Sequence, residues 1–320
     1  MKQYHPQASI TRLCSLFGFS RQAYYDYNQR EQTKQMHQQL ILSEVKAIRE
    51  LMPRIGSLKL HHMLKADLSA HHIPIGRDSF CTLLRHNGLM VKVRKSFYPK
   101  TTDSNHAFRK YKDLTPALRI SGVGQLWVSD ITYIRSASGF SYLSLITDAW
   151  SRKIIGHHLS LSLSVRGCLC ALNKAIASLS KEQRPVHHSD RGIQYCSDAY
   201  ISRLKERSIA ISMTQNGSPY ENAKAERING ILKSELGLHQ TFNNYSEAAA
   251  GVAKAISTYN QMRPHMSLNM LTPQQVHQLN QPTELETNRP LKPGRPSLNT
   301  CQPNTVLLQS SVKPTQYNQH

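Results

Sequence analysis

Three carboxylates in this sequence of 320 residues have the types and spacing of metal ligands, although they lie far apart along the chain. Asp130 falls in WVSDITYI, Asp190 in HHSDRGIQY and Glu226 in ENAKAERING, with 35 residues between the last two. Such a set suits two hard divalent cations with oxygen ligands. Two ions about 4 Å apart activate an attacking hydroxyl at a phosphodiester and stabilise the leaving oxygen. The spacing therefore predicts a phosphoryl-transfer site with Asp130, Asp190 and Glu226 as catalytic metal ligands, in preference to three separate structural acids.

Alternating apolar and polar residues predict the strands that must position these acids. Asp130 lies within the first predicted strand, Asp190 at the end of the fourth, and Glu226 on a long helix. Three antiparallel strands followed by alternating helices and strands form a mixed α/β sheet, in the element order of the ribonuclease H-like fold. The expected strands cover 126–134, 140–150, 153–161, 185–190 and 209–214, and the expected helices cover 164–179 and 198–208.

The helix with Glu226 is expected to begin near Ser218, because Ser218 fits the N-cap, Pro219 the first turn and Glu221 a capping box. Residues three and four apart share one helix face, which here is polar and is predicted to face metal and DNA phosphate. Glu235 is rotated off this face and is expected to be a solvated charge. The predicted face comprises Asn222, Glu226, Asn229 and Lys233.

His188 precedes Asp190 by two residues and therefore points to the same side of the predicted strand. Two roles are open for it, a second-shell group at the metal site or a half-buried structural histidine. Zinc is not expected, because the six cysteines include no CxxC pair.

The charge balance indicates a polyanionic partner. Lys and Arg number 40 against 20 Asp and Glu, a formal net charge of +20. Residues 1–120 hold 20 of the basic residues and only eight acidic ones. The hydrophobic share of 39% excludes disorder of the whole chain. The sequence lacks both an apolar run of membrane-spanning length and a secretion signal, so a soluble intracellular protein is expected.

The basic N-terminal third is predicted to carry small all-α units that bind DNA. Two short helices between Ile10 and Tyr27, joined at Gly18, have the pattern of a helix-turn-helix, with Arg21 and Gln22 at the exposed start of the second. A plain helical hairpin is the alternative. A connecting helix over 35–51 completes a first unit, residues 1–52, and a second helical DNA-binding unit is expected over 53–90.

Residues 91–120 are expected to form either a solvated linker or a basic arm that lies on DNA phosphates. Interleaved aromatic residues favour the arm. The catalytic core with a helical extension is assigned to 121–280, and the proline-rich residues 281–320 are predicted to be a disordered tail. The candidate phosphate contacts of the arm are Lys92, Arg94, Lys95, Arg109 and Lys110.

Taken together, these motifs resemble insertion-sequence transposases with a retroviral-integrase-like core, in which the second of two overlapping reading frames encodes the catalytic protein. The resemblance covers roughly residues 10–280. It departs from retroviral integrases in lacking a preceding HHCC zinc module, and Arg227 follows the glutamate where many relatives have a smaller polar residue. The motifs that carry it are LCSLFGFSRQAYY, GRDSFCTLLRHNGL, WVSDITYI, HHSDRGIQY, NGSPYENAKAERINGILKSEL and YNQMRPHMSLNMLTP.

The resemblance implies that Asp130, Asp190 and Glu226 are the catalytic acids and bind Mg²⁺ or Mn²⁺, with two ions expected. It implies nicking at the element ends, then attack of the freed 3′-hydroxyl on target DNA without a covalent enzyme intermediate. The expected partners are the terminal repeats, the target DNA, further copies of the chain, and a helix-turn-helix protein from the upstream reading frame. The expected location is the bacterial cytoplasm, in association with the nucleoid.

Two other functions remain open from the residues alone. A non-catalytic helix-turn-helix regulator accounts for the charge, but it gives the three acids no role. A hydrolytic nuclease on the same fold accounts for the acids, and it would cut DNA without joining it.

Overall fold

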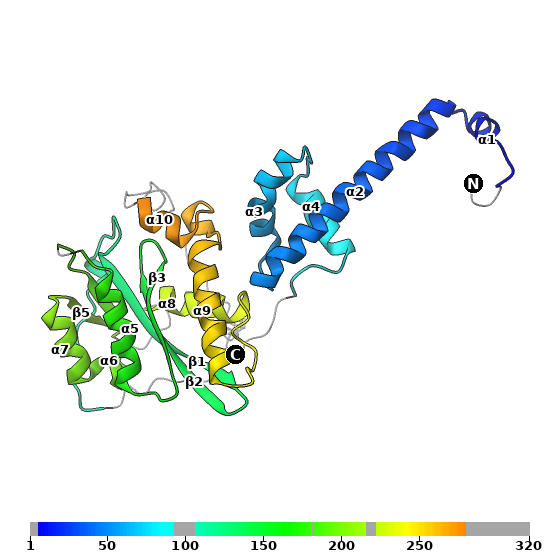
Figure 1. Ribbon diagram of the computed structural model, residues 1–320. Helices are drawn as coiled ribbons and strands as arrows, with labels where there is room; N and C mark the ends of the chain where they lie inside the picture. Colours follow the sequence, from blue (N-terminus) through cyan, green and yellow to red (C-terminus); the bar gives the residue numbers. More distant parts are fainter. Residues whose placement is uncertain (1–5, 93–105, 181, 216–221, 280–320) are drawn as a thin grey trace, which may run out of the picture. The chain divides into compact units, whose positions relative to one another are not determined.

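The C-terminal part of the protein is built around a five-stranded mixed sheet (Figure 1). The computed structural model describes residues 6–92, 106–180, 182–215 and 222–279. The strand order is β3-β2-β1-β4-β5, with β1, β2 and β3 antiparallel and with β4 and β5 parallel to β1. The predicted ribonuclease H-like arrangement is confirmed. The strands are β1 (Leu126–Ser136), β2 (Gly139–Asp148), β3 (Ile154–Ser160), β4 (Val186–Ser189) and β5 (Ala210–Met213).

Helices pack on both faces of the sheet because its strands alternate their apolar side chains. Leu145 of β2 belongs to a core with α8 and α9, whereas its neighbour Ile146 packs with α5 and α7 on the opposite face. Gly156 of β3 lets α5 approach closely, since an added Cβ would lie 2.3 Å from the carbonyl oxygen of Ala171. The helices are α5 (Val165–Ala177), α6 (Ile193–Cys196), α7 (Asp198–Glu206), α8 (Ala223–Ser234), α9 (Tyr245–Gln261) and α10 (Pro273–Leu279).

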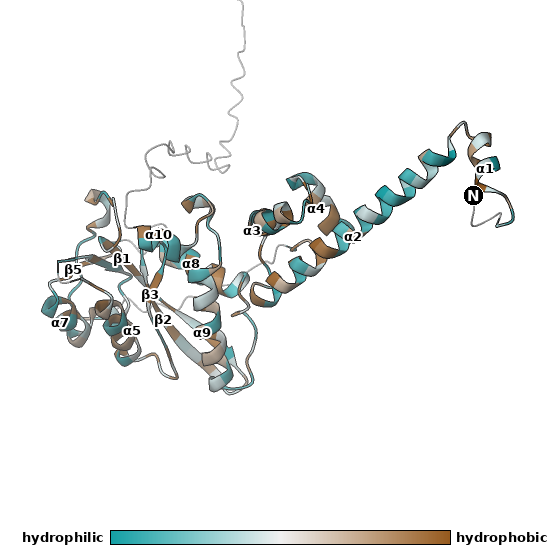
Figure 2. Ribbon diagram, turned by 45° about the horizontal axis from the view of Figure 1, so that its top comes forward, coloured by the Kyte–Doolittle hydropathy of each residue, from teal (hydrophilic) through white to brown (hydrophobic). Residues whose placement is uncertain are grey.

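Four α-helices precede the sheet in the described residues: α1 (Ile10–Leu16), α2 (Arg21–Leu51), α3 (Ser57–Ala70) and α4 (Arg77–His86). The prediction of a short second helix followed by a separate one over 35–51 was wrong, because α2 is continuous. Residues 28–34 lack apolar periodicity, but they contain neither Gly nor Pro and do not break the helix. Figure 2 shows the first part of α2 as mostly hydrophilic and the part beside α3 and α4 as more hydrophobic.

One hydrophobic cluster runs from the N-terminal helices into the core. It contains Ile41 and Val45 of α2 and Leu60 of α3, and it continues to Leu232 of α8 and Tyr259 of α9. Fully burying one such side chain contributes about 1.5–3 kcal/mol. The predicted divisions at 52 and 90 stay predictions, and the predicted tail lies outside the described residues. None of the described helices is long and apolar enough to cross a lipid bilayer.

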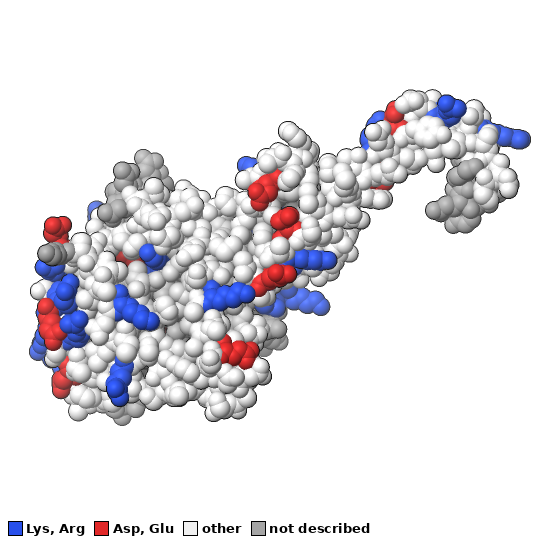
Figure 3. All heavy atoms as spheres, viewed as in Figure 1, with Lys and Arg blue, Asp and Glu red and all other residues white. Residues whose placement is uncertain are grey.

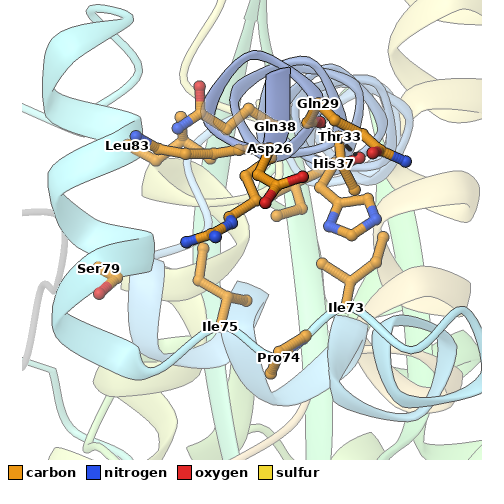
Figure 4. Close-up of a pocket in the computed structure, with 13 residues that line it drawn as sticks. Asp26, Gln29, Thr33, His37, Gln38, Ile73, Pro74, Ile75, Ser79 and Leu83 are labelled. Carbon is orange, nitrogen blue, oxygen red and sulfur yellow. Dashed lines mark hydrogen bonds between the residues drawn. The ribbon is translucent and has the colours of Figure 1, made fainter. Parts of the chain in front are cut away.

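A groove of about 640 Å³ lies between α2 and the segment joining α3 to α4 (Figure 4). Ile73, Pro74 and Ile75 form one apolar wall, while polar side chains of α2 such as Gln29 and His37 form the other. None of the three predicted acids lines it.

Candidate active site

Asp130 lies within β1, and Asp190 directly follows the last residue of the adjoining parallel strand β4. Val128 of β1 pairs with His188 of β4, and each acid lies two residues further along the chain. The charge of Asp190 acts on Asp130, so the two carboxylates lie near each other. Adjoining strands lie about 4.8 Å apart and residues two apart share a face. The parallel pairing of β1 and β4 therefore brings together two acids that are distant in the sequence.

Asp190 follows the last residue of β4, where the chain turns sharply. Its Oδ1 accepts a hydrogen bond of 3.0 Å from the backbone N–H of Gly192. An added Cβ on Gly192 would lie 3.0 Å from Asp190 Oδ1 and 3.3 Å from Oε1 of Gln194. Glycine at this position thus lets the loop fold back over the carboxylate and hold it.

Gly192→Ala is therefore expected to displace the Asp190 carboxylate and to lower the rate of the predicted phosphoryl transfer about tenfold, since small misplacements at a reacting centre carry large rate effects. Two quantities are measured, the rate of phosphoryl transfer and the equilibrium affinity for DNA. The rate should fall, and the affinity should stay unchanged. Gly230→Ala on α8 is the matched control, because a Cβ there would meet no atom within 4 Å. Equal rates for the two variants would contradict the expected displacement.

Glu226 reaches the same region from the helix on one face of the sheet. Two amides fasten α8 to β1 on either side of it. Asn222 Nδ2 donates to the carbonyl oxygen of Ser129 at 2.9 Å, and Asn229 Nδ2 donates to Oδ2 of Asp130 at 2.7 Å. Since Asn222 and Asn229 lie four residues before and three after Glu226, all three share one helix face. The glutamate is therefore directed by two bonds to consecutive residues of β1.

The three acids interact electrostatically. Burial, together with the charges of Asp190 and Glu226, raises the pKa of Asp130 to about 7, although hydrogen bonds from Asn229 and the Ile131 backbone oppose the rise. Partial burial also raises the pKa of Glu226, which remains an exposed side chain. Like charges at close range disfavour ionisation, and a bound cation removes that penalty.

In the described part of the chain, no three His, Cys, Asp or Glu side chains lie close enough together to enclose a metal ion. The three predicted ligands therefore do not form such a group, although the charges of Asp190 and Glu226 both act on Asp130.

Family comparisons agree with this geometry. Two models of the integrase core domain match, one over residues 121–219 and the other over 207–273. A Shigella sonnei protein of insertion element IS600, described as an uncharacterized 31 kDa protein, is 30% identical over 82% of this chain and 96% of its own length. Transposase InsF of insertion sequence IS3A from Escherichia coli (strain K12) is 29% identical over 88% of this chain and 98% of its own. This chain belongs to the insertion-sequence transposases.

The predicted family and enzyme class are thereby confirmed. Solved structures similar to this transposase include the HTLV-2 integrase catalytic core domain in complex with magnesium, with 19% identity, a TM-score of 0.38, and coverage of 48% of this chain and 96% of that one. A chain of the simian T-cell lymphotropic virus intasome has 18% identity, a TM-score of 0.43, and coverage of 78% and 80%.

Two of the four residues of the polar stripe of α8, Asn222 and Asn229, face the sheet of the transposase, whereas Glu226 is exposed. The prediction of a surface stripe was wrong for Asn222 and Asn229, whose side chains are buried against β1. The Nζ atom of Lys233 lies 4.0 Å from the ring centroid of Tyr133. Burial lowers the pKa of Lys233, whereas the nearby charge of Asp130 acts in the opposite direction.

The helix also begins later than expected. Described α8 starts at Ala223 with Asn222 at the N-cap, and the side chain of Asn222 makes no capping hydrogen bond because it is engaged with β1. The predicted capping residues Ser218, Pro219 and Glu221 lie outside the described residues.

His188 is buried beneath the segment that leads into the core. Its Nδ1 lies 2.8 Å from Oγ of Ser212 and 3.6 Å from Oδ1 of Asp113. These contacts are those of a structural histidine that ties residues 106–118 to the sheet. A second-shell role toward Asp190 stays a prediction.

The predicted DNA contacts of the N-terminal third lie at exposed positions where they are described. Arg21 and Gln22 open α2, and both are exposed, as is Lys92. On the face of the molecule in Figure 3, Lys and Arg side chains are scattered among Asp and Glu and form no single patch. Arg94 and Lys95 lie outside the described residues.

Arg109 and Lys110 are exposed on a segment that passes beside the Asp190 loop. A ring nitrogen of His106 lies 2.8 Å from the carbonyl oxygen of Arg191, the residue after Asp190. The basic segment is therefore anchored next to one of the three acids. Composition indicated a basic arm, but it gave no sign of this anchor.

Sequence reasoning missed a buried ion cluster at the end of α8. Glu235, expected to be solvated, accepts two hydrogen bonds from Arg263 and two from Lys59. The available signal was a carboxylate at a helix C-terminus, where the helix dipole disfavours negative charge unless a cation lies close by.

Proposed function

We propose that this transposase nicks DNA at the ends of its insertion sequence and joins the freed 3′-hydroxyl to target DNA. In this proposal Asp130, Asp190 and Glu226 are the catalytic residues and hold two Mg²⁺ or Mn²⁺ ions. The observation that carries it is the pairing of β1 with β4, which brings Asp190 at the end of β4 near Asp130 of β1, with α8 fastened to β1 on either side of Glu226.

The donor set fits hard divalent cations. Carboxylate oxygens are the ligands that Mg²⁺ takes in phosphoryl-transfer sites. Burial first, and then the charges of Asp190 and Glu226, raise the pKa of Asp130, and a cation bound beside it would offset both effects. The side-chain oxygens of Asn222 and Asn229 are also buried without a hydrogen-bond donor in the described structure. When bound, the ions would activate the attacking hydroxyl and stabilise the leaving oxygen.

The residues of the chain supply orientation. Asp130 is fixed through both of its oxygens, by the Ile131 N–H at 2.8 Å and by Asn229. Glu226 keeps an exposed side, which leaves an approach for DNA. Ser129, the hydroxyl nearest in sequence to Asp130, is instead buried, with its Oγ 2.7 Å from a ring nitrogen of His187. Direct attack by a DNA hydroxyl, with no covalent intermediate, suits this arrangement.

The proposal is tested by incubating the purified protein with a labelled duplex of its own element end, a target plasmid and MgCl₂. Labelled end covalently joined to plasmid supports transposition chemistry. Cut ends without joined product would indicate a hydrolytic nuclease, and binding without cleavage would indicate a DNA-binding regulator; either result contradicts the proposal.

DNA is proposed to pass over the segment with Arg109 and Lys110. Hydrogen bonds hold this segment to the core, among them one of 3.1 Å from Gln215 Nε2 to the carbonyl oxygen of Tyr111. Because it is anchored, its cations would meet DNA phosphates with little loss of freedom on binding. Arg21, Gln22, Lys92, Arg94, Lys95 and Lys233 are proposed as further contacts, and Asn222 and Asn229 act through β1.

Replacing Arg109 and Lys110 together by Ala is expected to weaken DNA binding uniformly across sequences. Loss of two phosphate contacts should reduce the slope of log K against log salt concentration by about two. Binding to element ends and to unrelated duplexes, measured over a salt series, checks this. An unchanged slope would place the DNA elsewhere. Replacing Lys205 and Arg207, two exposed residues at the C-terminal end of α7, by Ala gives a charge-matched control.

We further propose that the transposase acts as a homo-oligomer on DNA, since two element ends must be joined in one event. A helix-turn-helix protein from the upstream frame is a proposed partner, and the nucleoid is the proposed location. Light scattering of the protein with and without element-end duplex tests the assembly: a monomer in both conditions would contradict it.

A further inference from the structure

Three charged side chains meet at the C-terminal end of α8. Glu235 accepts hydrogen bonds of 2.9 Å from both Nε and Nη2 of Arg263, and its two oxygens each lie 3.1 Å from Nζ of Lys59. The side chains of Arg263, Lys59 and Glu235 are only 2%, 12% and 16% exposed. A paired guanidinium and carboxylate with two parallel bonds permit one relative orientation, which an apolar contact does not.

The members of this cluster come from different parts of the protein. Arg263 follows α9, whereas Lys59 lies in the first turn of α3. The backbone repeats the connection, because the N–H of Arg54 donates to the carbonyl oxygen of Glu235 at 3.2 Å. Glu235 thus joins the core to the turn that precedes α3 and to the first turn of α3.

The charge environment shows that the carboxylate is ionised within this cluster. Burial alone would raise the pKa of Glu235, but Arg263 and then Lys59 hold it below its ordinary value. Since Arg263 is the more deeply buried partner and forms both parallel bonds, removing Lys59 leaves the remaining pair intact. The two cations therefore have separable roles, Arg263 within the core and Lys59 across to α3.

Glu235 ends the same helix that carries Glu226. Nine residues separate them, so at 100° per residue they lie on opposite faces of α8. One face is held to β1 through Asn222 and Asn229, while the opposite face is held to α3 through Glu235 and Lys59. The helix is a rigid element between the sheet and α3, and a shift of α3 must act on it.

We propose that Glu235 is a positioning residue whose bond to Lys59 transmits the placement of α3 and α4 on DNA to the helix that carries Glu226. This inference rests on the proposed function, in which Glu226 serves catalysis, and on the predicted second DNA-binding unit over residues 53–90, which contains α3 and α4. DNA seated on the helical unit then favours the productive position of the glutamate.

The test uses Lys59→Met in the full chain, because Glu235→Gln would leave Arg263 buried without a counter-charge and unfold the protein. Amide hydrogen exchange of residues 223–235 is measured with and without a duplex of the element end. In the wild type, DNA should slow exchange in α3, α4 and α8. In Lys59→Met it should slow exchange in α3 and α4 only, with unchanged DNA affinity and thermal midpoint, and Lys59→Arg should restore the response of α8.

Joining rates give the second measurement. The wild type should join a full element end about tenfold faster than a duplex shortened to the bases beside the cleaved end, and Lys59→Met should remove this advantage without lowering the rate on the short duplex. Lys254→Met, at an exposed position of α9, is the control. Protection of α8 that survives in Lys59→Met, or a fall in thermal midpoint with equal loss on both duplexes, overturns the inference. Coupled exchange in a wild type that joins neither duplex would contradict the proposed function while supporting this inference.

Discussion

Asp130→Asn is expected to abolish end joining and, without divalent metal, to make the protein more stable. The loss of joining should exceed a thousandfold, because the amide would remove a charged ligand from the proposed metal site. The gain in stability follows from the removal of a carboxylate that burial and two neighbouring acids disfavour in its ionised form.

The sign of the stability effect follows from the pKa. Asp130 has a folded-state pKa raised from 3.8 to about 7, so its ionisation opposes folding above that pH and ceases to do so as the pH falls toward 4. At pH 8 a shift of this size corresponds to an upper bound of about 4 kcal/mol, and a gain of about 2 kcal/mol is expected for Asn. The expected gain is smaller than the upper bound because Asn has one side-chain oxygen and can accept only one of the two hydrogen bonds that Asp130 accepts, from the Ile131 N–H and from Asn229.

Denaturant unfolding in EDTA at pH 8 and at pH 5, beside a joining assay in Mg²⁺, measures both effects. The stability gain should shrink at pH 5, and Mg²⁺ should stabilise the wild type more than the variant. Asp198→Asn, at the exposed start of α7, makes the same chemical change away from the site and should leave joining intact. Joining by Asp130→Asn at the wild-type rate would remove the basis of the proposed mechanism.

Arg263→Met is expected to lower the free energy of unfolding by about 3–5 kcal/mol, the usual cost of removing one partner from a buried ion pair. Arg263 is only 2% exposed and supplies both parallel bonds to Glu235, so Lys59 alone would face a largely buried carboxylate. That loss is a large share of the 5–15 kcal/mol by which a typical domain is stable.

The chain contains a matched surface pair for comparison. Arg203 lies 2.7 Å from Glu206, but the two side chains are 35% and 59% exposed. In a urea titration of both variants, Arg203→Met should lower the free energy of unfolding by no more than about 1 kcal/mol, because water screens an exposed pair. Similar losses of unfolding free energy in Arg263→Met and Arg203→Met would show that burial does not strengthen the contribution of the Arg263–Glu235 pair.

The sheet and its acids could be predicted from local patterns. Alternation around Asp130 and the helix–strand order after 160 are properties of short windows, and the structure shows those strands and helices within a few residues. The position of Asp190 at a strand end could also be predicted locally, because Gly192 two residues later has no side chain to obstruct a turn over the carboxylate.

What failed depends on contacts between distant segments. The Asn222 and Asn229 amides were expected at a surface because amides are usually exposed, yet two hydrogen bonds to β1 offset their burial. The largely buried charge of Glu235 is stabilised by Arg263 and Lys59, which belong to other elements of the fold. The sequence pattern of α8 alone cannot predict that Lys59 of α3 and Arg263 after α9 pair with Glu235.

The unbroken course of α2 has a mechanical consequence. Arg21 in the first turn of α2 and Ile41, which is buried against the following helices, belong to one continuous helix. Twenty residues at a rise of 1.5 Å each separate them by about 30 Å. That length matches roughly nine base pairs of DNA at 3.4 Å each. Adding or deleting one residue between them would swing the tip by about 100° around the helix axis and point Arg21 away from any groove it had faced.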